Sequence, residues 1–99
     1  MAANIYISVL LDRYGPILSE KQFRILDGYY NNDLSLSEIA ENEGITRQGV
    51  CDIIKRCEHQ LVDLEEKLKI VSIVSELKGL ADVGDDEKLK NLLNYIEKL

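Results

Sequence analysis

The side chains best suited to a chemical role in this 99-residue chain fall between positions 47 and 56. Arg47 can donate two hydrogen bonds to guanine, and Gln48 can pair with adenine, if the helix that carries them enters a major groove. Lys55 and Arg56 follow on the same stretch and can neutralise phosphates. Asp52 lies among them and repels phosphates unless it pairs with a neighbour such as Lys55 or Arg56. The candidate nucleic-acid contacts are Arg47, Gln48, Lys55 and Arg56, and the alternative is a solvated first helical turn at Arg47 and Gln48.

Residues 34–56 have the pattern of two short helices joined by a tight turn. Ser35 and Glu38 have the spacing of a capping box, in which each side chain serves the other residue's backbone N–H. Gly44 suits the left-handed residue that ends a helix, and Thr46 can cap the helix that follows. The pattern predicts a helix-turn-helix whose second helix is the recognition helix. A plain helical hairpin can carry the same caps, and this alternative stays open because short motifs are weak signals.

The charge balance bears directly on this prediction. The chain has 12 basic and 18 acidic residues and a net charge of -6, whereas DNA-binding proteins usually carry a basic footprint. Residues 1–56 hold six bases against eight acids, or -2, and residues 57–99 hold six against ten, or -4. The predicted helix-turn-helix half is therefore the less acidic half without being basic. This weakens the DNA-binding interpretation without removing it, because charge can cluster on one face.

Other chemistry finds little support in the residue pattern. Cys51, Cys57 and the single histidine, His59, fall short of a structural zinc set. We interpret the two cysteines as small buried or half-buried thiols. On one helix they lie about 9 Å apart along the axis, which is too far for a disulfide. Neither a phosphate-binding glycine loop nor a catalytic arrangement is evident, so we expect no enzyme, no cofactor and no metal.

Composition and length suggest the general class of protein. Apolar residues make up 45% and charged residues 30% of the chain, which is typical of a folded soluble domain. No apolar run approaches the roughly 18 residues that a membrane span requires. The N-terminus has no basic segment followed by an apolar one. We therefore expect a cytoplasmic protein.

Two helices are expected before the helix-turn-helix. The first covers residues 3–13 and ends at Gly15-Pro16, with inward side chains at Ile5, Val9 and Leu10. The second runs from about Glu20 to Tyr30 behind a Ser19–Gln22 capping box. Its expected core residues are Phe23, Leu26 and Tyr30. Tyr29 and Tyr30 can stack on bases or pack at the edge of the core.

A long helix should follow Thr46, since no proline or glycine occurs between Val50 and Lys78. Residues 47–78 would form a helix of about 48 Å. Its heptad stripe consists of Val50, Ile54, Cys57, Leu61, Leu64, Leu68 and Val71. The C-terminal segment or a second copy can cover the part of the stripe that overshoots, and a break into two helices is a further alternative. We predict a homodimer through Leu61, Leu64, Leu68 and Val71.

The C-terminal segment is expected to be a linker, residues 79–86, and a helix capped by Asp85. Its apolar stripe is Leu89, Leu92, Leu93, Ile96 and Leu99. So short a helix needs a partner surface, and it is either a lid on the long helix or a docking element for another protein. The predicted domains are residues 1–78, the helix-turn-helix domain with its extended last helix, and residues 79–99, the linker and C-terminal helix.

The chain also resembles known families. Residues 35–56 are similar to the helix-turn-helix of the fourth region of bacterial sigma factors. Four separated motifs resemble the bacterial YlxM family in order and spacing: Tyr14-Gly15-Pro16-Ile17-Leu18-Ser19-Glu20-Lys21-Gln22, Tyr29-Tyr30, Asp33-Leu34-Ser35-Leu36 and Ile53-Ile54-Lys55-Arg56. This resemblance covers roughly residues 1–75. Gly49 and Cys51 depart from it, because an alanine and an aromatic residue are expected there.

The YlxM resemblance implies a small helix-turn-helix protein with a regulatory role in the signal recognition particle pathway, since genes of the family typically neighbour those of the particle's GTPases. We therefore expect an all-α fold, a sigma region 4-like helix-turn-helix bundle with a long helix after the turn and a C-terminal helix. The expected partners are DNA or RNA, bound weakly and in a salt-sensitive way, and components of the particle. The alternative is an adaptor that binds protein or RNA without sequence-specific DNA binding.

Overall fold

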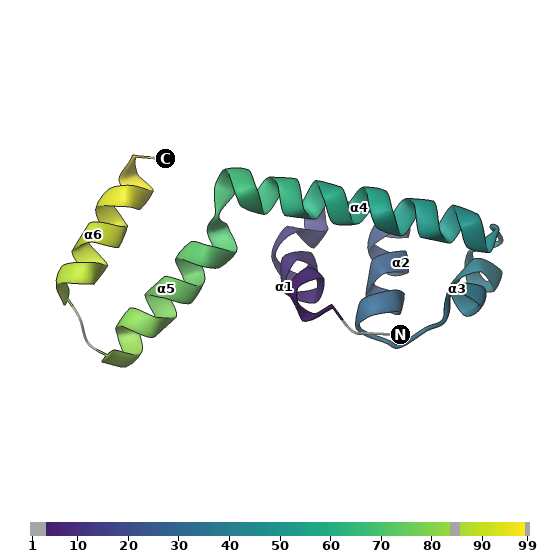
Figure 1. Cartoon of the computed structure of the whole chain (residues 1–99), viewed down its shortest axis with the longest axis horizontal. Helices are drawn as coiled ribbons and strands as arrows, with labels where there is room; N and C mark the ends of the chain where they lie inside the picture. Colours follow the sequence, from purple (N-terminus) through teal and green to yellow (C-terminus); the bar gives the residue numbers. More distant parts are fainter. Residues whose placement is uncertain (1–3, 84–85, 99) are drawn as a thin grey trace. The chain divides into compact units, whose positions relative to one another are not determined.

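The computed structural model describes residues 4–83 and 86–98, and every regular element in them is helical. In chain order these are α1 (Ile5–Tyr14), the 3-10 helix η1 (Gly15–Ile17), α2 (Glu20–Tyr30), α3 (Leu36–Glu43), α4 (Arg47–Leu68), α5 (Ile70–Val83) and α6 (Asp86–Glu97) (Figure 1). This confirms the expected all-α fold. The chain forms two compact units, Met1–Leu68 and Lys69–Leu99.

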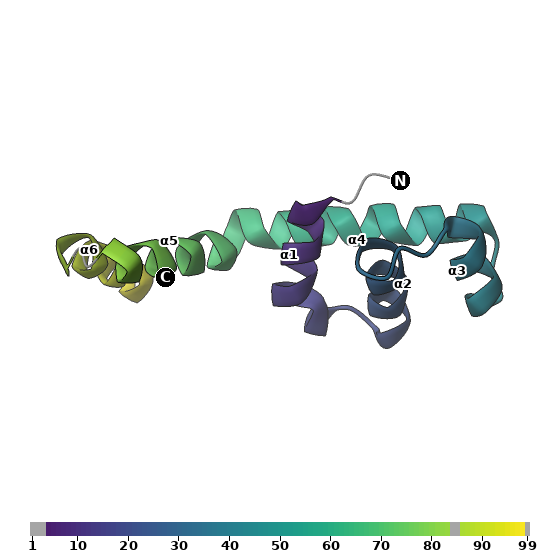
Figure 2. The same cartoon turned by 90° about the horizontal axis from the view of Figure 1, so that it is seen from below.

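In the first unit, α1, α2 and α3 pack against one side of α4 (Figures 1 and 2). On α4 the fully or nearly fully buried apolar side chains recur at steps of four and three residues, which keeps them on one face of the helix. They are Val50, Ile54, Cys57 and Leu61. Leu10 and Leu11 of α1 and Ile25 and Leu26 of α2 meet them and are at most 1% exposed. Burial of these side chains is the main stabilising term for this unit.

The first helix turns a different face inward from the one predicted. Ile5 is 76% exposed and Val9 is 40% exposed, although both were expected in the core, whereas Leu10 is buried as expected. The buried residues of α1 are Ile7, Leu10, Leu11 and Tyr14. These four make a complete stripe at i, i+3, i+4 and i+7, which the shorter expected set does not. The stripe also brings Tyr14 to α4, where its hydroxyl donates a hydrogen bond to the buried Glu65 carboxylate at 2.7 Å.

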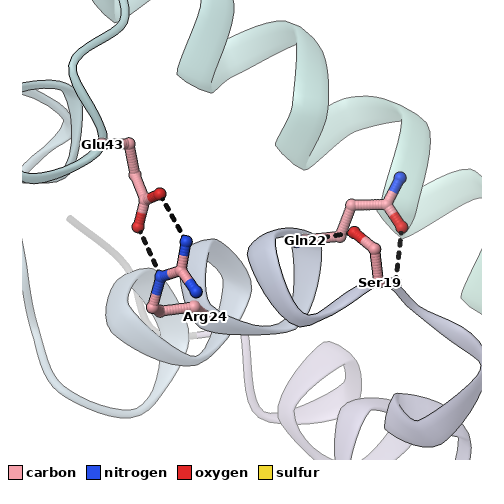
Figure 3. Close-up of polar contacts among 4 residues, drawn as sticks. All are labelled: Ser19, Gln22, Arg24 and Glu43. Atoms are coloured by element: carbon pink, nitrogen blue, oxygen red, sulfur yellow. Dashed lines mark hydrogen bonds and ion pairs between the residues drawn. The ribbon is translucent and has the colours of Figure 1, made fainter.

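The second helix begins with the expected capping box. The Ser19 hydroxyl accepts a hydrogen bond from the Gln22 backbone N–H at 3.1 Å, and the Gln22 side-chain oxygen accepts one from the Ser19 N–H at 3.0 Å (Figure 3). Leu26 is fully buried as predicted, but Phe23 is 39% exposed. The Phe23 ring covers Gly15 instead, since a Cβ at Gly15 would lie 2.7 Å from a Phe23 ring carbon. The core prediction was therefore right for Leu26 and wrong for Phe23.

The long helix predicted from residue 47 to residue 78 is divided in two. Lys69 has a positive φ of 55°, which interrupts the helical hydrogen-bond ladder between α4 and α5. The alternative of two helices was correct. The boundary between the two units follows Leu68, before the one expected at residue 78. Helix α5 then continues to Val83 and includes Gly79, so most of the expected linker is helical. Asp85, the expected cap of the last helix, lies outside the described residues.

Candidate nucleic-acid interface

The turn between α3 and α4 has the local geometry that the sequence predicts. The Ser35 hydroxyl accepts a hydrogen bond from the Glu38 N–H, and the Glu38 carboxylate accepts one from the Ser35 N–H, each at 3.0 Å. These hydrogen bonds hold the pKa of Glu38 below its ordinary value. Gly44 has φ 68° and ψ 32°, in the left-handed region, and its N–H donates to carbonyl oxygens of the last turn of α3. The Ile45 N–H donates to the Ala40 carbonyl at 3.1 Å, which completes a Schellman-type helix end.

Helix α4, the second helix of the helix-turn-helix, is capped by Thr46, whose hydroxyl accepts a hydrogen bond from the Gly49 N–H at 3.0 Å. The candidate contact residues Arg47, Gln48, Lys55 and Arg56 are all exposed. They share α4 with the buried Val50 and Ile54, so the packing that fixes the helix also fixes which residues face outward. The structure thus places all four candidates on the accessible part of α4.

Asp52 occupies the same exposed face. Gln48 Nε2 donates a hydrogen bond to Asp52 Oδ1 at 2.9 Å, whereas Arg56 Nε reaches only the Asp52 backbone carbonyl at 3.4 Å. The partner of the Asp52 carboxylate is therefore Gln48, and neither Lys55 nor Arg56, the neighbours that the sequence offered, pairs with it. Gln48 has one amide proton engaged with Asp52, which leaves its second amide proton and its carbonyl oxygen for a base. In the part of the chain that the structure describes, the side chains of Arg47 and Lys55 form no hydrogen bond or ion pair.

A bidentate ion pair holds α2 to the end of α3. Arg24 Nε and Nη2 donate to the two Glu43 carboxylate oxygens at 2.7 Å each (Figure 3). These hydrogen bonds hold the pKa of Glu43 below its ordinary value. Glu43 lies directly before the Gly44 turn, so the pair ties the C-terminal end of α3 to α2. Sequence reasoning missed it, because no local pattern links residues 19 positions apart.

The two adjacent tyrosines serve packing. The Tyr29 and Tyr30 rings meet edge to face, with their centroids 5.0 Å apart, and both side chains are half-buried. The Tyr30 hydroxyl donates a hydrogen bond to Glu58 of α4. Burial raises the pKa of Glu58, and the nearby His59 opposes this rise. These contacts favour packing over base stacking, the other interpretation of the pair.

The cysteines differ in their surroundings. Both are free thiols; Cys57 is buried in the first unit and Cys51 is half-buried. Burial raises the pKa of the Cys57 thiol, and the charge of Arg56 opposes this rise. His59 is exposed. Within the described residues, no three His, Cys, Asp or Glu side chains gather where they could hold a metal ion.

The residues predicted for a dimer interface differ in their exposure. Leu61 is fully buried in the first unit, so its side chain cannot reach a second copy while that unit is folded. Leu64 is half-buried and Leu68 is 43% exposed. Val71 is half-buried and belongs to α5, beyond the break at Lys69. Leu61 is therefore removed from the predicted interface, and the other three stay predictions.

Comparison with known sequences places this geometry in a family. The model of the family described as "Putative helix-turn-helix protein, YlxM / p13 like" matches residues 1–98. This chain belongs to the UPF0122 family. A UPF0122 protein of Clostridium kluyveri is 46% identical over 107 residues, covering 97% of this chain and 96% of that protein. One of Clostridium acetobutylicum is 40% identical over 109 residues (99% and 94%), and one of Fusobacterium nucleatum is 43% identical over 96 residues (96% and 93%).

The UPF0122 match confirms the resemblance to YlxM and extends it. The expected similarity ended near residue 75, whereas the family match reaches residue 98 and so includes α5 and α6. The second unit is therefore a UPF0122 feature and not an addition peculiar to this chain. The description of the family names a helix-turn-helix protein and no catalytic activity. In the described residues, no helix combines the length and the apolar character that crossing a bilayer requires.

Proposed function

We propose that this protein binds nucleic acid through the exposed face of the first three turns of α4. The observation that carries the proposal is the left-handed turn at Gly44, which presents α4 as a capped second helix of a helix-turn-helix. Arg47 and Lys55 lie on that helix, exposed, and within the described residues their side chains have no intramolecular partner. The UPF0122 description as a helix-turn-helix family supports the same conclusion.

We place this activity in the signal recognition particle pathway, as a regulatory or accessory function in the cytoplasm. The support is membership of the family described as YlxM-like, together with the gene neighbourhood typical of YlxM proteins. The proposed partners are a nucleic acid and components of the particle. No catalytic step, cofactor or metal is part of the proposal.

Binding by the free protein should be weak and sensitive to salt. Residues 1–68 hold seven bases against twelve acids, or -5, and Asp52 lies on the proposed contact face. With two to four phosphate contacts per subunit, a dimer should show a log–log salt slope of about -4 to -7. We expect binding that is measurable at about 50 mM salt and largely lost near 200 mM.

A titration of labelled duplex DNA and of the particle's RNA at these two salt concentrations tests the proposal. Arg47→Ala and Lys55→Ala should each weaken binding and leave the helical circular dichroism unchanged. Arg13→Ala is the matched control, because it removes one exposed positive charge from α1 rather than from α4. If neither nucleic acid binds at the lower salt, or all three variants behave like the wild type, the nucleic-acid proposal is wrong.

The second candidate function is a protein or RNA adaptor. The acidic balance of the first unit favours it, because a net charge of -5 over residues 1–68 disfavours unaided binding to DNA. An adaptor would retain its protein or RNA partners in a pull-down after DNase treatment, whereas a DNA-binding regulator would lose them. Nanomolar, sequence-selective DNA binding at the higher salt would exclude the adaptor.

We also propose a homodimer. Its support is the apolar surface that the first unit leaves accessible at Leu68, which is 43% exposed, and the half-buried Leu64 and Val71. Sedimentation equilibrium at protein concentrations of order 10⁻⁵ M is the test, since a dimer of ordinary affinity is populated there.

A further inference from the structure

The second unit contains an open groove between α5 and α6. Its volume is about 770 Å³, and its lining includes Lys69, Ser72, Glu76 and Gly79 on the α5 side and Leu92 and Tyr95 on the α6 side. The α5 residues recur at steps of three and four, so one face of that helix borders the groove. All of these residues lie within the unit Lys69–Leu99.

This unit buries little of its own apolar surface. Of its described side chains only Leu92 is buried, at 8% exposed, whereas Leu93 and Tyr95 are 47% and 44% exposed. Chains below about 40 residues usually need disulfides, metals or oligomerisation for stability. Both cysteines lie in the first unit, so a disulfide within the second is ruled out. Further burial of apolar surface on the α5–α6 hairpin must therefore come from contacts outside this hairpin.

The groove face of α5 suits a closely packed helix. Ser72 and Gly79 are small, and a Cβ at Gly79 would find no other atom within 4 Å. Small residues let two helix axes approach to the lower end of the usual 8–10 Å range. Ile73 lies between them on the same face and supplies an apolar contact.

The positive and negative charges on this face can pair with the opposite charges on the same face of a second copy. Lys69 directly precedes α5 and Glu76 lies seven residues further along the chain, and both line the groove. When two such helices lie antiparallel about a two-fold axis near Ser72 and Ile73, Lys69 of each faces Glu76 of the other. Neither forms an ion pair in the part of the chain that the structure describes. Residues 69–99 hold five bases and six acids, or -1, so two hairpins repel each other little, unlike two first units at -5.

We propose that the groove receives α5 of a second copy, so that two α5–α6 hairpins form a four-helix bundle. This rests on the proposed homodimer and assigns its main contact to the second unit. The bundle would bury Ile73 and Tyr95 of both copies and form two Lys69–Glu76 ion pairs across the interface.

Sedimentation equilibrium of the full chain and of charge-reversal variants tests this. The wild type should sediment at twice the 11.3 kDa chain mass. Lys69→Glu and Glu76→Lys should each weaken the dimer by about tenfold, because each places two like-charge pairs in the interface. The double variant Lys69→Glu/Glu76→Lys should regain most of the wild-type affinity. Lys78→Glu is the control, since it makes the same charge change on α5 away from the groove.

The possible outcomes distinguish dimerisation through the groove from dimerisation through another surface. A wild-type monomer at about 10⁻⁵ M overturns both. A wild-type dimer that neither single reversal weakens, or a double variant no tighter than the single ones, overturns the groove contact and leaves a dimer elsewhere. Weakening by both single variants with recovery in the double variant is specific to direct contact between positions 69 and 76, because a general charge effect would make the two opposite charge changes act in opposite directions.

Discussion

Gln48 Nε2 donates a hydrogen bond to Asp52 Oδ1 at 2.9 Å, one turn further along the exposed face of α4. The side chain best placed to read adenine is thus held by the side chain that most disfavours phosphate. A hydrogen-bond donor of a ligand that reaches this face can also be accepted by the Asp52 carboxylate. Among bases, the cytosine amino group is such a donor.

Asp52→Asn should strengthen binding to DNA and RNA by about three- to tenfold, since one charge near a phosphate is worth about 1 kcal/mol in water. The asparagine oxygen can still accept the hydrogen bond from Gln48, so the fold should not change. A salt titration of labelled nucleic acid measures the effect. Glu66→Gln removes the same charge about 21 Å further along α4 and should have little effect. Equal responses to the two substitutions would show that Asp52 is not at the contact.

The Arg24–Glu43 pair should make stability depend on pH. The folded-state pKa of Glu43 lies below its ordinary value, so its contribution is present above the unfolded pKa and is lost as pH falls through the folded pKa. Glu43→Gln should therefore flatten the fall in thermal midpoint between about pH 5 and pH 3. Glu41→Gln, on the same helix, is the control. If both variants keep the wild-type pH profile, the pair does not contribute in solution.

Glu58 should make folding stability depend on pH in the opposite direction from Glu43. Burial raises its folded-state pKa, so stability is greatest below the unfolded pKa and declines as pH rises through the folded pKa. Glu58→Gln keeps an acceptor for the Tyr30 hydroxyl and removes the charge. The variant should melt slightly higher than the wild type at pH 7, and the two should converge near pH 4. A lower midpoint at pH 7 would mean that the charged form makes a better hydrogen bond than its burial costs.

Leu61 and Leu68 should respond differently to truncation. Leu61→Ala should cost about 2–5 kcal/mol of unfolding free energy, because it empties a fully buried site. Leu68→Ala should cost less than about 1 kcal/mol, because that side chain is 43% exposed, and should weaken self-association. Urea unfolding and sedimentation measure the two effects. A large loss of stability at Leu68 and a small one at Leu61 would contradict the burial described here.

Features set by neighbouring residues were predictable from sequence. The Ser19–Gln22 and Ser35–Glu38 boxes and the left-handed Gly44 depend on atoms within one helical turn. Helix orientation was less predictable, because Ile5 and Ile7 are equally apolar and only tertiary packing selects Ile7 for the core. The break at Lys69 has no proline or glycine to mark it, and the heptad continues across it.

Within the candidate site, the same distinction applies. Exposure of Arg47 and Lys55 followed from helical spacing relative to Val50 and Ile54. Helical spacing could not predict the partner of Asp52, because Gln48, Lys55 and Arg56 all lie within reach on the same helix. Only the side-chain geometry selects among them. Contacts such as Arg24–Glu43 depend on the packing of separate helices, which residue spacing does not encode.

The hydrogen bond between Tyr14 and Glu65 joins residues 51 positions apart. Helix α1 leaves the ribosome before α4 and is therefore among the last parts of this unit to be completed, because its partner surface is the far end of α4. The α3–α4 turn, by contrast, can form as soon as its own residues emerge. A nascent chain halted before residue 65 would leave Leu10 and Leu11 without part of their cover, exposed to chaperones and to other unfinished chains.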